Sequence, residues 1–153
     1  METIYIGVDP SLKSTGIAIL DFENGQCRSV ALSCLDAGSY INDFADFFLG
    51  SKFDRLVVAI ERPPKYQRGM VTHAVANEIG ARVKNLWGKA ATIHYVVPAT
   101  WRKAVLGNGK AGKLEAIGYA LAVHQIKTKN SDIAEAVCIA EYAKSLDAGR
   151  VEQ

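Results

Sequence analysis

The sequence predicts one mixed α/β domain, in which a sheet of three antiparallel strands continues into parallel strands and carries helices on both faces. Three observations predict this fold class. Apolar residues alternate along two segments near the amino terminus, the hairpin signal Asn24-Gly25 precedes a third strand-like run, and strand-like and helix-like segments alternate after that. The 153 residues suffice for one well-packed domain, which we expect to span residues 1–153.

The first three predicted strands form an antiparallel meander. Apolar side chains alternate with others over residues 3–9, and residues 14–22 form a second β-rich run. The short turn 10–13 separates these two strands, and the third run, residues 26–35, follows Asn24-Gly25. Such short connections favour antiparallel neighbours.

The remaining chain alternates strands with helices. Residues 56–60 are a continuous β-branched apolar run, typical of a strand buried on both faces, and residues 92–97 form a further strand that Pro98 closes. Apolar spacing predicts helices over residues 40–49, 70–87, 101–106, 113–125 and 132–146. This alternation is typical of a layered α/β domain.

Composition excludes several classes of protein. No apolar run is long enough to span a membrane, and the start METIYIGVDP lacks the basic and small-residue features of a signal peptide. We therefore expect a soluble, cytoplasmic protein that does not associate with membranes. Cys27, Cys34 and Cys138 lack zinc-ligand spacing and cannot all pair within one chain, which argues against a zinc site and a disulfide framework.

Positive charge is concentrated in the middle of the chain. Between Arg62 and Lys113 there are ten Lys and Arg residues and one acid, Glu78, although the net charge of the whole chain is only +2. This distribution favours a polyanionic partner such as nucleic acid. Charge alone leaves open a simpler explanation, a solvated helix face with scattered lysines.

Four acidic residues are expected at one edge of the sheet. Asp9 ends the first strand and Glu61 follows a buried strand, so both emerge at the same edge if the two strands are parallel neighbours. Asp132 and Glu135 are three residues apart at the start of a helix and share a face. Because clustered carboxylates repel one another, oxygen ligands in this arrangement predict a divalent cation, Mg²⁺ or Mn²⁺.

Each acid also has a structural explanation that the sequence leaves open. Asp9 could start an Asx turn, and Glu61 could face solvent or pair with Arg62. Asp132 at a helix start with Glu135 three residues later fits a capping box. The occurrence of all four acids in these positions of one short chain favours the metal site.

Four segments together resemble the RuvC-type Holliday junction resolvases of the ribonuclease H-like superfamily. These segments are IGVDPSLKSTGIAIL, VVAIERPP, VPATWRKAVLGNGKAGKLEAI and SDIAEAVCIAEYA. The resemblance covers nearly the whole chain and implies a ribonuclease H-like mixed sheet. It also implies a metal-dependent DNA endonuclease that cuts four-way junctions, and other branched DNA where it accepts them, by symmetric nicking. Because two symmetric nicks require two active sites, a homodimer is implied.

The resemblance also assigns roles to individual residues. Asp9, Glu61, Asp132 and Glu135 match the family's metal-binding acids, and Lys113 matches a lysine near the scissile phosphate. We therefore expect two Mg²⁺ ions per active site, with Mn²⁺ as a substitute, and no small-molecule cofactor. Glu135 stands where the family usually has Asp, and its side chain is one methylene longer, so metal geometry or preference is expected to shift.

Basic and aromatic residues in the middle segment are the predicted DNA contacts. These residues are Lys65, Tyr66, Arg68, Arg102, Lys103 and Lys110. Tyr66 either separates bases at the junction centre or is a surface tyrosine in a basic loop. Trp87 and Trp101 are expected to pack in the core or between helices. Small residues of the helix over 70–87 (Ala74, Ala76, Gly80 and Ala81) are expected to form the dimer seam.

Two other functions remain open. The turn in DPSLKSTG also resembles the phosphate loop of actin-like ATPases, which share the core topology. Those proteins place the nucleotide between two lobes, whereas 153 residues supply one. The other function is a DNA-binding dimer that does not cleave, against which the presence of all four acids argues.

Overall fold

The computed structural model describes residues 2–21, 26–33, 36–37, 39–40, 43, 53–63 and 69–151. Its strands are β1 (Glu2–Asp9), β2 (Thr15–Asp21), β3 (Gln26–Leu32), β4 (Phe53–Glu61) and β5 (Ala91–Val96). Its helices of two turns or more are α2 (Gly69–Trp87), α3 (Pro98–Leu106), α4 (Lys113–His124) and α5 (Ser131–Val151), and the 3₁₀ turn η1 (Gly88–Ala90) follows α2. Within the described ranges, no helix is long and apolar enough to cross a membrane.

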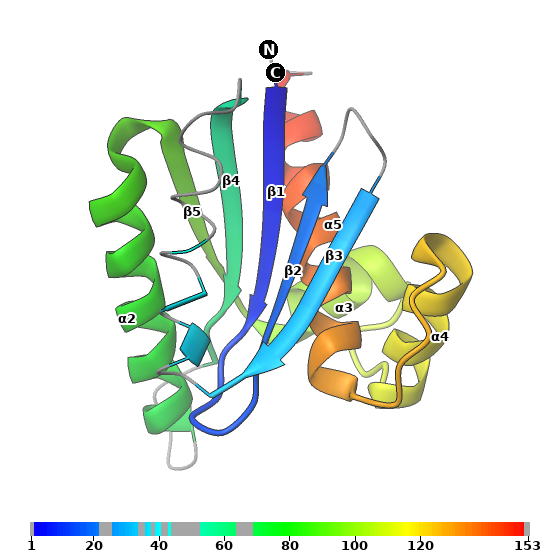
Figure 1. The fold of residues 1–153 in the computed structure, drawn as a ribbon. Helices are drawn as coiled ribbons and strands as arrows, with labels where there is room; N and C mark the ends of the chain where they lie inside the picture. The colour runs from blue at the N-terminus through cyan, green and yellow to red at the C-terminus, as the bar shows by residue number, and fades with distance from the viewer. Residues whose placement is uncertain are drawn as a thin grey trace.

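The sheet has the predicted mixed topology. Its strand order is β3-β2-β1-β4-β5. The pairs β1–β2 and β2–β3 are antiparallel, whereas β1–β4 and β4–β5 are parallel. Helix α2 covers one face, and α3, α4 and α5 lie on the other (Figure 1). This arrangement is the predicted ribonuclease H-like mixed sheet with helices on both faces.

The predicted elements agree with the structure except at some boundaries. The third strand ends at Leu32 rather than at residue 35, and α5 continues to Val151 instead of ending at residue 146. Strand β4 begins at Phe53, earlier than the apolar run that predicted it. The Asn24-Gly25 turn and most of the predicted helix 40–49 lie outside the described residues.

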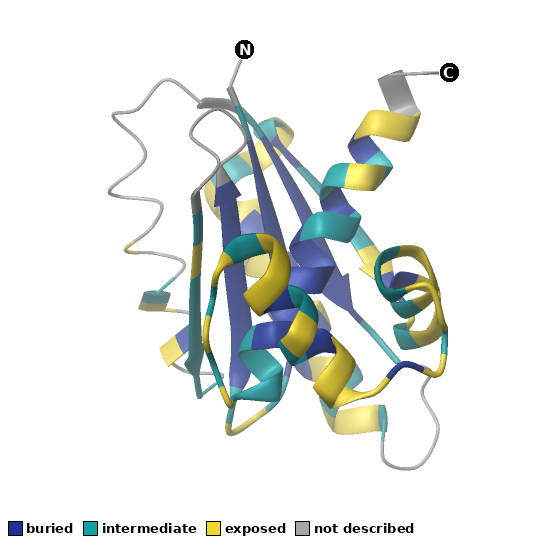
Figure 2. Ribbon diagram, turned by 90° about the vertical axis from the view of Figure 1, so that its right-hand side faces the viewer, coloured by how far each residue is buried: buried dark blue, intermediate teal, exposed yellow. Residues whose placement is uncertain are grey.

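Alternation along β1 separates the two cores. Ile4, Ile6 and Val8 pack with buried side chains of α2, whereas Tyr5 belongs to the core on the α5 side. Figure 2 shows that buried residues run along the central strands and along the side of α5 that faces them. Asp9 therefore shares the face of β1 that α5 covers.

The proposed seam on α2 is wrong for two of its four residues. Ala76 is fully buried in the core between α2 and the sheet. Gly80 is also buried, and a Cβ there would lie 2.0 Å from the hydroxyl oxygen of Tyr95. The small size of Ala76 and Gly80 lets the sheet pack closely against α2. Of the four predicted seam residues, Ala74 and Ala81 are the two that are exposed to another chain.

Helix α5 lies against the sheet because small residues line the contact. A Cβ at Gly7 would lie 2.2 Å from the carbonyl oxygen of Ala136 and 2.2 Å from the amide nitrogen of Ala140. A Cβ at Gly16 would lie 2.1 Å from the carbonyl oxygen of Asp132. The two glycines therefore fix how closely the first half of α5 approaches β1 and β2.

Polar contacts hold the carboxyl-terminal part of α5 against β1 and β4. The Tyr5 hydroxyl donates a hydrogen bond of 2.8 Å to Oδ2 of Asp147, and Arg55 forms an ion pair with Oδ1 of the same carboxylate. Burial, followed by the bond to Asp147, raises the pKa of Tyr5 to about 12. These contacts stabilise the part of α5 that extends past the predicted end, where Asp147 is a buried residue of the helix.

Candidate metal centre

Two of the predicted acids lie side by side at the carboxyl edge of the sheet. In the parallel register of β1 and β4, Val8 pairs with Ile60, so Asp9 and Glu61 are the next residues on neighbouring strands. Both are buried, with 7% and 8% of their surfaces exposed. The strands thus place two carboxylates at one edge, as the sequence predicted.

The structural explanations for Asp9 and Glu61 are wrong. Thr15, rather than Asp9, closes the turn after β1. Its hydroxyl accepts a hydrogen bond from the backbone N–H of Ser11 and donates one to the carbonyl oxygen of Ser11. Arg62 does not pair with Glu61. Its guanidinium donates to Oδ1 of Asn77 at 3.0 Å and stacks 3.9 Å from the ring centroid of Tyr95.

Helix α5 supplies the other two acids from its first turns. Asn130 caps this helix, since its Oδ1 accepts hydrogen bonds from the backbone N–H groups of Asp132 (2.8 Å) and Ile133 (3.4 Å). The alternative explanation of Asp132 and Glu135 as a capping box is therefore wrong. Because Asn130 caps the helix, the carboxylates of Asp132 and Glu135 are not needed for capping and are available at the edge of the sheet where Asp9 lies.

Three of the four acids converge closely enough to share a metal ion. One carboxylate oxygen from each of Asp9, Asp132 and Glu135 lies within 4.8 Å of the others. Oδ2 of Asp9 is buried, and no residue in the described part of the chain forms a hydrogen bond with it. An all-oxygen donor set with a buried, unbonded oxygen fits Mg²⁺ or Mn²⁺.

The electrostatics of the cluster show an excess of negative charge. Burial, followed by the charge of Glu61 and the hydrogen bond and charge of Glu135, raises the pKa of Asp9 to about 10. Burial likewise raises the pKa of Glu61, although its hydrogen bond with Trp101 acts in the opposite direction. Without a cation, a proton must therefore offset part of the negative charge.

Helix α3 contacts two of the acids through consecutive residues. The indole Nε1 of Trp101 donates a hydrogen bond of 2.6 Å to Oε2 of Glu61. Nη2 of Arg102 lies 3.3 Å from Oε1 of Glu135 and forms an ion pair with it. Arg102, a predicted DNA contact, thus lies beside the acids themselves. Sequence reasoning missed the Trp101–Glu61 contact, for which the only signal was a helix beginning directly after the strand next to β4.

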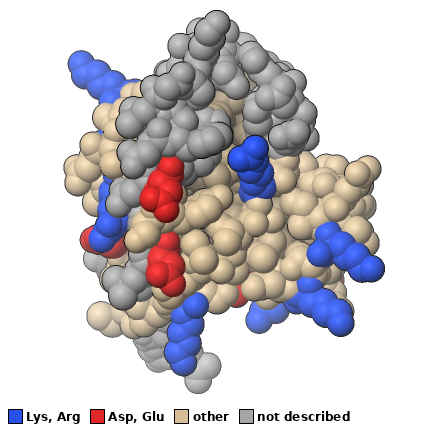
Figure 3. Space-filling model, in the orientation of Figure 1, with Lys and Arg blue, Asp and Glu red and all other residues tan. Residues whose placement is uncertain are grey.

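The other predicted site residues are on the surface or outside the described residues. Lys113 is the first residue of α4, and its side chain is exposed, as are those of Lys103 and Lys110. Figure 3 shows Lys and Arg side chains at the right of the molecule, where α4 lies in Figure 1. The remaining predicted DNA contacts lie outside the described residues: Lys65, Tyr66 and Arg68.

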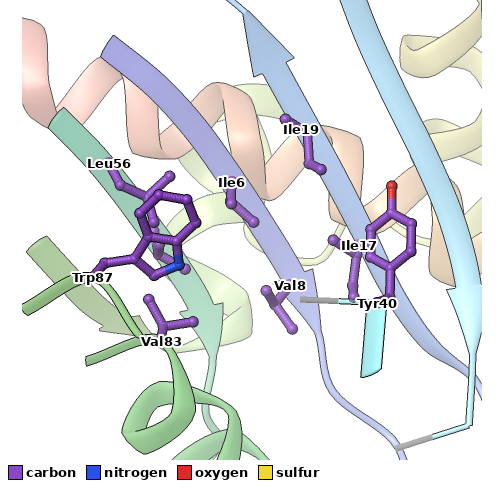
Figure 4. A pocket seen from close by; sticks show the side chains of 9 residues that line it. Ile6, Val8, Ile17, Ile19, Tyr40, Leu56, Val83 and Trp87 are labelled. Carbon is purple, nitrogen blue, oxygen red and sulfur yellow. The ribbon is translucent and has the colours of Figure 1, made fainter. Parts of the chain in front are cut away.

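A small apolar hollow lies on the opposite face of the sheet, between β1, β2, β4 and α2 (Figure 4). The residues that line it are Ile6, Val8, Ile17, Ile19, Tyr40, Leu56, Val58, Val83 and Trp87. Its lining offers no charged group for a phosphate. This hollow therefore does not support the nucleotide-binding alternative.

Comparison with known proteins identifies the fold. No protein-family model matches the chain, and neither does any curated protein. Among solved structures, RuvC of Thermus thermophilus superimposes with a TM-score of 0.61 at 17% identity, covering 90% of each chain. The fold is that of RuvC. The T. thermophilus RuvC complex with a Holliday junction substrate gives a TM-score of 0.62 at 15% identity, again over 90% of each chain. At these identities the likeness concerns the fold, so function must be argued from the residues.

Proposed function

We propose that this protein is a cytoplasmic, metal-dependent endonuclease that cleaves four-way DNA junctions by symmetric nicking as a homodimer. The observation that carries the proposal is the convergence of buried and half-buried carboxylates at one edge of a RuvC-like sheet, with an oxygen of Asp9 left without a hydrogen bond in the described part of the chain. Such crowding is costly in a metal-free core and useful around a divalent cation. The T. thermophilus RuvC was solved with a Holliday junction substrate, which supports the same substrate class here.

The acids would hold two Mg²⁺ ions, with Mn²⁺ as a substitute. Asp9, Asp132 and Glu135 form the close group, and Glu61 completes the set from β4. When bound, the metal supplies Lewis-acid stabilisation of the charge that develops on the phosphate and on the leaving oxygen during hydrolysis. Asp9 lies on the central strand of the sheet, which holds its carboxylate rigidly.

Cations of α3 and α4 would act on the phosphates. Arg102 lies beside Glu135 and could contact the scissile phosphate once a metal ion balances that carboxylate. Lys113 would offset phosphate charge from the start of α4, where the backbone N–H groups also favour an anion. Lys65, Arg68, Lys103 and Lys110 would position the duplex arms, and Tyr66 would contact the unpaired bases at the junction centre.

The proposal is tested by incubating the purified protein with a synthetic four-way junction, with and without Mg²⁺. Paired nicks at symmetric positions that require Mg²⁺ are expected, and a linear duplex of the same sequence should stay intact. Binding without nicking in Mg²⁺ or Mn²⁺ would instead identify a non-cleaving junction-binding protein. ATP hydrolysis without nicking would favour the nucleotide-binding alternative.

Salt dependence of junction binding should identify the phosphate contacts. Each neutralised phosphate contributes about −0.9 to the slope of log affinity against log salt. Replacing both Lys65 and Arg68 with Ala should make that slope less steep and weaken binding to all junction sequences alike, because phosphate contacts do not read sequence. Titrations at several salt concentrations measure the slope.

Lys113→Ala provides the comparison for that double variant. Because Lys113 is expected to act on the transition state, its loss should lower the cleavage rate of bound complexes more than the affinity. If both variants changed rate and affinity in the same proportion, the assumed division between positioning and catalytic cations would be wrong.

A further inference from the structure

The contact between Trp101 and Glu61 links α3 to the candidate metal centre. The Trp101 side chain is fully buried, and its indole Nε1 lies 2.6 Å from Oε2 of Glu61. Glu61 is itself buried, with 8% of its surface exposed. The bond therefore joins two side chains that solvent barely reaches, where a hydrogen bond to a carboxylate is strong.

Chain geometry places Trp101 at this position. Strand β5 runs parallel to β4, and Val96 is the register partner of Glu61. The backbone N–H of Arg62 also bonds the carbonyl oxygen of Val96 at 2.8 Å, which ties the two strand ends together. Two residues after Val96, Pro98 begins α3, so the first turns of this helix lie at the edge of the sheet where Glu61 emerges.

Core packing alone does not account for this contact. A buried indole needs an acceptor for its N–H, which an uncharged backbone carbonyl would satisfy. Trp101 instead bonds a carboxylate whose charge acts on the acid cluster, since Glu61 raises the pKa of Asp9. The bond also occupies one lone pair of Oε2 of Glu61 and fixes the plane of the carboxylate, whereas both lone pairs of Oε1 stay outside this bond.

We propose that Trp101 is a positioning residue of the metal centre: it holds Oε2 of Glu61 so that this carboxylate presents Oε1 to the divalent cation. This inference rests on the proposed function, because it assumes that the acids bind a metal. Its consequence is that Glu61 binds the cation through one oxygen in a fixed orientation. Loss of the indole N–H should therefore weaken metal binding even when the shape of the side chain is kept.

The test removes the N–H without removing the ring. In a Trp87→Phe background, Trp101 is the sole tryptophan of the chain, and it can be replaced by 3-benzothienylalanine, in which sulfur stands in place of the N–H. Mg²⁺ affinity is measured by isothermal titration calorimetry in the absence of DNA, and thermal melting verifies that each protein is folded. We expect affinity to fall about 10-fold relative to the Trp87→Phe parent.

Three further measurements separate positioning from packing. Trp87→Phe, which changes a tryptophan packed against the other core, should leave Mg²⁺ affinity at the wild-type value. In that protein, Mg²⁺ should change the fluorescence emission of Trp101, and Glu61→Gln should abolish the change. Trp101→Phe should reproduce the weaker affinity of the sulfur analogue.

The outcomes distinguish this inference from the proposed function. If the sulfur analogue bound Mg²⁺ as tightly as its parent, Trp101 would be a core residue only, and the positioning role would be overturned while the metal centre stood. If the wild-type chain bound neither Mg²⁺ nor Mn²⁺, the proposed function would itself be overturned, and the positioning role with it.

Discussion

Asp9→Asn should abolish junction cleavage while preserving junction binding. Asp9 lies between the acids of β4 and α5, and its Oδ2 is buried without a hydrogen bond in the described part of the chain. An amide supplies one neutral oxygen in place of a carboxylate, so metal affinity falls. Metal stabilisation of a transition state is worth several kcal/mol, and each 1.36 kcal/mol is tenfold in rate. We therefore expect the nicking rate to fall by about 10³-fold or more.

Binding should be unchanged or tighter in the same variant. The substitution adds no negative charge close to where phosphates would lie, and it leaves the surface lysines untouched. Single-turnover cleavage in Mg²⁺ and junction titrations in Ca²⁺ or EDTA measure the two quantities separately. A variant that nicked junctions at the wild-type rate would rule out the acids as the catalytic centre.

Asp9→Asn should also stabilise the metal-free protein. Burial and the neighbouring carboxylates raise the pKa of Asp9 from 3.8 to about 10. The stability associated with that shift is fully present below the unfolded value and is lost as pH rises toward 10, so at neutral pH the folded chain has lost part of it. The amide carries no charge at any of these pH values. Its melting temperature in EDTA should therefore exceed the wild-type value, increasingly so from pH 5 to pH 9.

Asp147→Asn is the matched control for this stability effect. Asp147 is a buried acid of the same chain, with 9% of its surface exposed, but it is paired with Arg55 and accepts a hydrogen bond from Tyr5. Its neutralisation leaves Arg55 without its partner and should lower the melting temperature. A rise in both variants, or a fall in both, would contradict the argument that the acids of the metal centre are distinguished by crowding.

Much of the fold could be predicted because its signals are local. The alternation of Ile4, Ile6 and Val8 assigned β1 its two faces, and the apolar run before Glu61 identified a strand buried on both sides. Parallel pairing of these two strands then brought Asp9 and Glu61 together without knowledge of any loop. The positions of the acids were predictable because they lie at strand ends and at the start of a helix. They do not depend on long-range packing.

Contacts that depend on packing could not be predicted in the same way. The partner of the Trp101 N–H depends on the one-residue connection between β5 and α3, which hydrophobic spacing does not reveal. The ion pair of Arg102 with Glu135 depends on how α3 crosses α5. The contacts of Asp147 could not be predicted because Arg55 and Tyr5, its partners, are distant in sequence.

Gly7→Ala should strongly destabilise the protein and disturb its metal centre. The added Cβ would lie 2.2 Å from backbone atoms of Ala136 and Ala140, which no side-chain rotation can relieve. Overpacking of a core typically costs about 1–3 kcal/mol, and backbone clashes lie at the upper end or beyond. At about 2–4 °C for each kcal/mol in a chain of 153 residues, the melting temperature should fall by about 6–12 °C.

Gly118→Ala provides the matched control, because a Cβ at that position meets nothing within 4 Å. Gly118 is an exposed residue within α4, where alanine is favoured over glycine by about 1 kcal/mol. The same chemical change should therefore raise the melting temperature.

Since the Gly7 variant can relax only by moving α5 away from β1, Asp132 and Glu135 would move with it, and Mg²⁺ affinity should fall in the fraction that remains folded. A Gly7 variant with wild-type stability and Mg²⁺ affinity would show that the close approach of α5 does not hold the two halves of the acid cluster together.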